Sequence, residues 1–263
     1  MERSLPSPSV AQKELLAIIG RLREMPIGRP YNDILLDRDR ALAESLLEIY
    51  PSRVHGILGI MATITGQEGA MRHHFLEARA HDPQSSYIRI NHIVALQGFA
   101  CFSEAAQESR EACREFPRQV DLVTEAVHSC VAAGRFHEAV NWLDERAKLE
   151  DGRTPLAEEV GIRACSRFLL EVRVSDVEVE TVQGVIASLL RECGVLGPVA
   201  RYRMCVEEVD HWVSLRYRLP RSVAEVVQLE WELAGRLAAM DLSDRLHRNL
   251  VVGFLAEEIN DAD

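Results

Sequence analysis

Three histidines in one segment, His73, His74 and His81, form the densest cluster of histidines in the sequence. If this segment is a helix, His73 and His74 point about 100° apart, which makes neighbouring histidines a poor pair of ligands. His74 and His81 share a helix face but lie about two turns apart, too far for a tetrahedral site without other ligands. We therefore expect these histidines to lie on a helix surface, and we assign no metal and no cofactor.

Two groups of carboxylates are the next candidates for chemistry. Asp37 and Asp39 alternate with arginines, which is typical of the solvated start of a helix. Glu207, Glu208 and Asp210 lie at the tip of a predicted hairpin, whose turn at residues 208–211 accounts for Asp210. The sequence contains none of the phosphate-loop, dinucleotide-binding, zinc-protease or nucleophile-elbow motifs. We therefore assign no catalytic residue and expect a protein that is not an enzyme.

Composition and charge limit the class of partner. Of 263 residues, 47% are hydrophobic, enough for a real core, and the net charge is -11. A large nucleic-acid surface needs clustered Lys and Arg, so we expect no nucleic-acid partner. No two of the six cysteines have C-x-x-C spacing, and we expect all six to be reduced thiols. With no apolar leader after Met1 and no long apolar segment, we expect a cytoplasmic protein without a membrane partner.

Between Pro51 and Asp151, residues of one kind recur at a spacing of about 34. The register is carried by four sets of positions: Gly66, Ala100 and Gly134; Met71, Ala105 and Ala139; Phe75, Ser109 and Leu143; Pro83, Pro117 and Asp151. A unit of this length is a helical hairpin, which buries its apolar side only by stacking on its neighbours. Stacked hairpins leave an extended, partly concave surface, which favours a protein that holds another protein.

Local signals place elements before and after the repeats. Helices are expected at about residues 9–23 and 37–50 and, beyond a predicted cap at Thr154 and Pro155, up to 173 and from 175 to 193. Ser175 and Glu178 have the spacing of a capping box, and Gly194 suits the residue that ends the helix.

The pattern then changes to a period of two. Apolar residues alternate with polar ones at 201–207 and 212–219, which predicts a β-hairpin. Ser222 and Glu225 form a second capping box, which opens a helix to about residue 240. Residues 250–255 suit either a strand or a helix, and the pair Val251-Val252 favours a third strand.

The pair Leu58-Gly59 and the run from Ala133 to Val140 resemble the tetratricopeptide repeat (TPR) family. The resemblance covers residues 52–151, although Arg89, Val123 and Arg146 depart from its pattern. It implies a mainly α fold: a TPR-like array of helical hairpins followed by a small α+β segment of a β-hairpin, a helix and a third strand. The predicted organisation is a flexible tail (1–10), an N-terminal helical cap (11–51), TPR-like repeats (52–151), C-terminal helices of the array (152–198) and a small α+β domain (199–263).

In TPR proteins the first helix of each hairpin lines the concave face. The resemblance therefore implies a protein or peptide partner held by Arg53, Ile60, Thr63, Tyr87, Ile90, Val94, Gln97, Asp121, Thr124, His128 and Val131. These residues form an apolar floor with some hydrogen-bonding groups, which suits a helix or an extended peptide. Trp212 lies on the polar side of its predicted strand and is either a further contact or packed on the helices.

Three alternatives to a plain adaptor remain open. A ligand sensor or an enzyme would have its pocket between the helical array and the C-terminal α+β domain, with Tyr202, Arg203, Trp212 and Arg216 as candidates. An immunity protein or secretion chaperone is a second, because an acidic chain attracts a basic partner. A homodimer through an open strand edge of the C-terminal domain is a third.

Overall fold

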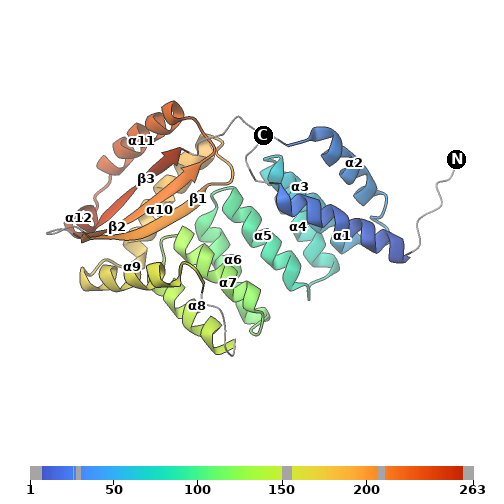
Figure 1. Cartoon of the computed structure of the whole chain (residues 1–263), viewed down its shortest axis with the longest axis horizontal. Helices are drawn as coiled ribbons and strands as arrows, with labels where there is room; N and C mark the ends of the chain where they lie inside the picture. Colours follow the sequence, from blue (N-terminus) through green and yellow to red (C-terminus); the bar gives the residue numbers. More distant parts are fainter. Residues whose placement is uncertain (1–7, 26, 28–30, 150–155, 207–210, 257–263) are drawn as a thin grey trace. The chain divides into compact units, whose positions relative to one another are not determined.

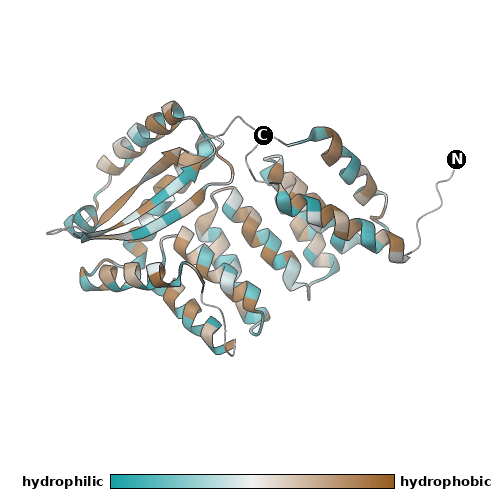
Figure 2. Cartoon of the chain, viewed as in Figure 1, coloured by the Kyte–Doolittle hydropathy of each residue, from teal (hydrophilic) through white to brown (hydrophobic). Residues whose placement is uncertain are grey.

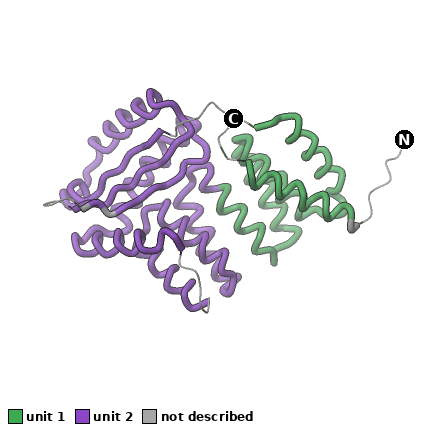
Figure 3. Tube along the Cα trace, in the orientation of Figure 1, with its two compact units in different colours: residues 1–95 green, residues 96–263 purple. Residues whose placement is uncertain are grey.

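The computed structural model describes residues 8–25, 27, 31–149, 156–206 and 211–256. The chain divides into two compact units, residues 1–95 and 96–263 (Figure 3). Both contain helical hairpins joined by short turns, and the second also contains a three-stranded sheet (Figure 1). The expected fold class, TPR-like helical hairpins followed by a small α+β segment, is confirmed.

The first unit is entirely helical in its described part. Its helices are α1 (Pro8–Glu24), α2 (Asp33–Glu44), α3 (Pro51–Ile64), α4 (Glu68–His81) and the start of α5 (Ser86–Gly98). Both α1 and α2 pack against α3. The apolar face of α1 is buried, with Leu15, Ile18 and Leu22 in one cluster with Val54 and Ile57 of α3.

Helix α2 differs from its prediction in two ways. It begins at Asp33 because Asn32 caps it, accepting a hydrogen bond from the backbone N–H of Leu35, and it already ends at Glu44. The expectation that Asp39 is solvated is wrong, since this residue is only 2% exposed. Its carboxylate instead accepts hydrogen bonds from Nε and Nη2 of Arg21 on α1, at 2.8 and 2.5 Å. This bidentate pair joins two helices that the sequence pattern treats separately.

The second unit contains the remaining hairpins. Its helices are α6 (Phe102–Glu115), α7 (Val120–Ala132), α8 (Phe136–Leu149), α9 (Glu159–Glu171), α10 (Asp176–Glu192), α11 (Val223–Ala238) and α12 (Asp244–Asn249). Both predicted capping boxes are present, Ser175 with Glu178 on α10 and Ser222 with Glu225 on α11. The cap predicted at residues 154 and 155 lies outside the described residues, but the helix that it was expected to open, α9, begins only at Glu159. Of the turn predicted at 208–211, residues 208–210 also lie outside the described residues, and His211 already belongs to a strand.

The sheet follows the order β1 (Val199–Val206), β2 (His211–Leu219), β3 (Leu250–Ala256). The first two strands are antiparallel, with Val199 opposite Arg218, as the predicted hairpin requires. The third strand, mostly hydrophobic in Figure 2, is confirmed. It runs parallel to β2, with Val213 opposite Leu250, because α11 and α12 carry the chain back before it enters the sheet.

The turns of the hairpins share one geometry. Gly66, Ala100 and Gly134, which share a register in the repeat, have φ of 71°, 56° and 81°. After each one, the next residue's N–H bonds to a carbonyl five residues back, as in the 2.8 Å bond from Arg135 to Cys130. These are Schellman caps, which need a left-handed residue. Arg173, with φ of 58°, ends α9 in the same way outside the 34-residue spacing.

Gly59 lets the two helices of the first hairpin approach closely. A Cβ atom at this position would lie 2.9 Å from Cε2 of Phe75 on α4. Phe75 is itself 2% exposed, so its ring has little room to move away.

In the second unit, the sheet and the helical hairpins share one hydrophobic core. Tyr217 of β2 is fully buried, and its ring stacks on Phe102 of α6 with centroids 5.2 Å apart. Its hydroxyl lies 2.9 Å from the carbonyl oxygen of Ala132, at the end of α7, and 2.6 Å from Oε1 of Gln183 on α10. One strand residue therefore connects β2 with two different hairpins.

Candidate functional site

The predicted partner-binding residues divide between the two units. Arg53, Ile60, Thr63, Tyr87, Ile90 and Val94 belong to the first, and Gln97, Asp121, Thr124, His128, Val131 and Trp212 belong to the second. Apart from Trp212 on β2, all lie on α3, α5 or α7, the first helices of their hairpins. Six of them line two separate hollows, which we call groove 1 and groove 2.

Groove 1 lies in the first unit and has a volume of about 480 Å³. Helix α1, helix α3 and the first turn of α5 form its walls. Three predicted residues line it: Arg53, Ile60 and Tyr87. The other aliphatic side chains around it are those of Leu15, Leu16, Ile19, Ile57 and Ile88. The groove is therefore mainly apolar, as a site for an apolar anchor side chain requires.

Two glycines give groove 1 part of its depth. Gly20 of α1 and Gly56 of α3 both line it, and a Cβ atom added to either would have no neighbour within 4 Å. Gly56 is nevertheless buried, so the space beside it is the groove itself. A glycine inside a helix costs about 0.5–1 kcal/mol relative to alanine. No close helix contact explains Gly56, in contrast to Gly59 three residues later.

Charged groups lie at the rim of groove 1. Arg23 and Arg53 are exposed and, within the described part of the chain, neither forms an ion pair, while Asp82 contributes one carboxylate. The guanidinium of Arg23 lies over the ring of Tyr87, 5.5 Å from its centroid. The hydroxyl oxygen of Tyr87 is buried and has no hydrogen-bond partner among the residues described.

The other predicted residues of the first unit lie outside groove 1. Thr63 is 3% exposed, and its hydroxyl donates to the carbonyl oxygen of Gly59 on the same helix at 2.8 Å. Its side chain therefore does not face a partner. Ile90 is half-buried, and Val94 is exposed further along α5. Sequence reasoning missed the contribution of α1 to the groove. The one sequence signal for a hollow here was Gly56, a glycine in the middle of an apolar helix and away from any turn.

Groove 2 lies in the second unit and has a volume of about 510 Å³. Three predicted residues, Gln97, His128 and Val131, line one side. Other lining residues are Pro198, residues 199–202 of β1, and residues around the start of α9. Tyr202, a candidate for a pocket between helices and sheet, is among them, while Arg203, Trp212 and Arg216 are not.

A buried polar network adjoins groove 2. Nε2 of Gln97 donates to Oγ of Ser129 at 2.8 Å, and Ser129 contacts the hydroxyl of Ser109 at 3.0 Å. Burial raises the pKa of Glu125, against the opposing effects of the His128 charge and a hydrogen bond from Gln97. A carboxyl group with a raised pKa beside a hollow is a candidate proton donor. The sequence analysis did not single out Glu125, because nothing local shows that it is buried.

The remaining predicted residues do not line either groove. Thr124 donates to the carbonyl oxygen of Val120 and accepts a 3.0 Å hydrogen bond from Nε of Arg146. This bond explains how Arg146 replaces a small residue in the repeat pattern at only 8% exposure. Asp121 is exposed on α7, and Trp212 is half-buried on β2.

Comparisons with known proteins give only distant likenesses. No protein-family model matches the sequence, and no curated protein matches it. A solved structure of a MamA mutant is 19% identical with a TM-score of 0.35, covering 53% of this chain and 95% of that one. PilF of Pseudomonas aeruginosa is 12% identical with a TM-score of 0.31, covering 70% and 92%. Both TM-scores are low, so we draw nothing about function from either. Among the residues described, no helix has the length and apolarity to cross a membrane.

Proposed function

We propose that this protein is a non-enzymatic adaptor that binds a segment of a partner protein in groove 1. The observation that carries the proposal is the apolar hollow beside Gly56, on the face of α3 that the TPR resemblance assigns to partner binding. An apolar side chain of the partner would fill this hollow and would thereby be removed from solvent. Burying such a side chain contributes about 1.5–3 kcal/mol.

The rim of groove 1 indicates the chemistry of the partner segment. Arg23 and Arg53 carry two positive charges without carboxylate partners in the described chain, against the single carboxylate of Asp82. Guanidinium groups pair with carboxylates in bidentate, charge-assisted hydrogen bonds. We therefore expect an apolar anchor with an acidic side chain next to it. This local preference is opposite to that of the chain as a whole, whose net charge is -11.

A peptide array tests the proposal directly. The probes are short peptides with Leu or Phe beside Asp or Glu, and matched peptides with Lys in place of the acidic residue. The wild type should prefer the acidic set, and Arg53→Glu should reverse the preference. Gly56→Leu should abolish binding because its side chain enters the groove without a clash.

The control is Gly184→Leu. Gly184 lies on α10 in the second unit, and a Cβ atom there also has no neighbour within 4 Å. It should bind peptides as the wild type does. Equal binding by Gly56→Leu and Gly184→Leu, or no discrimination between the acidic and basic peptides, would refute the assignment of groove 1.

A second candidate function is a small-molecule sensor that uses groove 2. The observation that favours it is the hollow between α7 and β1, where Gln97, His128 and Tyr202 meet. Thermal melting in the presence of polar metabolites would reveal a ligand as a concentration-dependent rise in Tm. Val131→Trp would fill the hollow and should remove that rise, whereas Gly56→Leu should leave it unchanged.

A further inference from the structure

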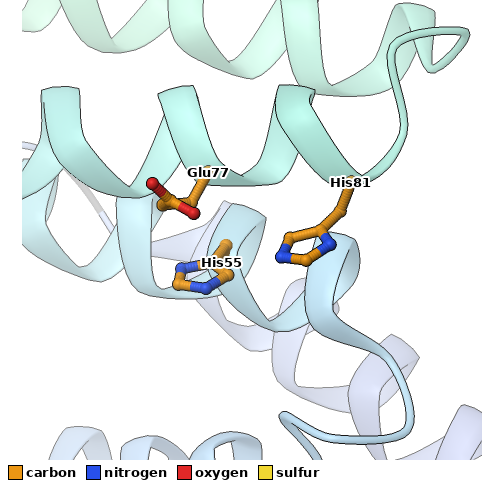
Figure 4. Close-up of side chains that lie close together, drawn as sticks. All are labelled: His55, Glu77 and His81. Carbon is orange, nitrogen blue, oxygen red and sulfur yellow. The ribbon is translucent and has the colours of Figure 1, made fainter.

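Three side chains that could ligate a metal ion meet in the first unit (Figure 4). His55 comes from α3, while Glu77 and His81 lie one helical turn apart on α4. One potential ligand atom from each residue lies within 4.8 Å of the other two. The rings of His55 and His81 are stacked, with centroids 6.0 Å apart and planes 11° from parallel.

The sequence analysis rejected a metal site on the spacing of His73, His74 and His81 along one helix. The structure adds two ligands that it did not consider, His55 from the neighbouring helix and Glu77, which shares a face of α4 with His81.

A fourth histidine orients the first. Nδ1 of His55 and Nδ1 of His74 lie 3.1 Å apart, so one ring donates a proton and the other accepts it. With Nδ1 of His55 engaged in this way, its Nε2 is left to bind an ion. Metal-bound histidines usually have such a hydrogen bond on their other ring nitrogen, which fixes the orientation of the ring.

We propose that His55, Glu77 and His81 form a binding site for a divalent transition-metal ion, with zinc as its best match. Two imidazole nitrogens and one carboxylate are a ligand set that zinc accepts, with a fourth position left for water. Magnesium and calcium prefer oxygen ligands and fit this set poorly. This proposal does not rest on peptide binding in groove 1.

The geometry requires only a modest closure. Zinc bonds of about 2.0–2.2 Å in a tetrahedral arrangement place ligand atoms about 3.4 Å apart, so each separation, which is at most 4.8 Å, must shorten by at most about 1.4 Å. His55 is held by His74, whereas Glu77 is half-buried and His81 is exposed, so the closure falls to the side chains of Glu77 and His81. The bound ion would connect α3 to α4 and stabilise the first hairpin.

The test is a zinc titration of the full chain by calorimetry, after treatment with EDTA and removal of the chelator. The wild type should bind one zinc ion per chain, and Tm measured by circular dichroism should rise with zinc concentration. His81→Ala and His55→Ala should each weaken zinc binding more than tenfold. His74→Ala should weaken it about tenfold, as expected for a residue that positions a ligand.

The matched control is His247→Ala, an exposed histidine on α12 in the second unit, which should leave zinc affinity unchanged. His81 is exposed, so its replacement tests the site even if His55→Ala fails to fold. Absence of zinc binding by the wild type would overturn the proposal. So would binding by His81→Ala with unchanged affinity, because the ion would then be held by other surface histidines.

Discussion

Replacing Tyr217 by phenylalanine removes one oxygen atom from the centre of the second unit. That oxygen lies within hydrogen-bond distance of the carbonyl oxygen of Ala132 and the side-chain amide of Gln183. A phenol has only one proton, so it donates to one group and accepts from the other. Nε2 of Gln183 has no partner within the described chain, and turning the amide about lets Nε2 donate to Tyr217 while Tyr217 donates to Ala132.

The magnitude follows from these two contacts. Losing one buried hydrogen bond costs about 1 kcal/mol, and leaving the Gln183 amide buried without a partner adds about 1–3 kcal/mol. Gln183 is 1% exposed, so water cannot replace the missing hydroxyl without rearrangement. We expect Tyr217→Phe to lower the free energy of unfolding by about 2–4 kcal/mol.

Urea denaturation followed by tryptophan fluorescence measures this change. All three tryptophans lie between residues 96 and 263, so the signal reports the second unit. Tyr202→Phe is the control, since the Tyr202 hydroxyl forms no hydrogen bond within the described residues, and it should change stability by less than about 0.5 kcal/mol. In a double-mutant cycle, Gln183→Leu should cost less on the Tyr217→Phe background than alone. A change below about 0.5 kcal/mol for Tyr217→Phe, or additive effects in the cycle, would refute the reasoning.

Three further predictions concern the second unit and use the same denaturation assay. Gly134→Ala should cost about 3 kcal/mol, because φ is 81° and the new methyl group would lie 2.8 Å from Cγ1 of Val179. Gly184→Ala, where a Cβ atom meets no neighbour within 4 Å, should stabilise by about 0.5–1 kcal/mol. Similar values for both variants would contradict the explanation. Arg173→Gly should stabilise by about 1 kcal/mol because it relieves a left-handed residue on the surface, and Arg173→Ala should not. Burial raises the pKa of Glu125, so its stabilising contribution is present at low pH and is lost as pH rises through the raised pKa. Glu125→Gln should therefore raise stability more at pH 8 than at pH 4, and an equal effect at both would show that folding does not raise this pKa.

Much of the local structure could be predicted because it depends on residues that are close in sequence. The capping boxes at Ser175 and Ser222 need only a glutamate three residues later. The left-handed turns at Gly66 and Gly134 follow from the repeat register and from the conformational freedom of glycine. The third strand at 250–256 follows from its β-branched residues.

Packing between distant segments is where the sequence reasoning stopped. Asp39 has the pattern of a solvated helix residue, but Arg21 reaches it from another helix and keeps it buried. The wall that α1 adds to groove 1 could not be derived from a repeat that begins after it. Parallel pairing of β3 with β2 depends on where α11 and α12 return the chain, which no alternation of residues specifies.

The sequence by itself determined that the chain forms helical hairpins, where each one turns, and which helix faces are apolar, because these properties are set within a few residues or by a short repeat. Only the tertiary structure decided which side chains meet. It brought His55 to the histidines of α4, placed Tyr217 between two hairpins, and left the space beside Gly56 open. Such contacts join positions far apart in the chain, and they depend on how all the helices pack together.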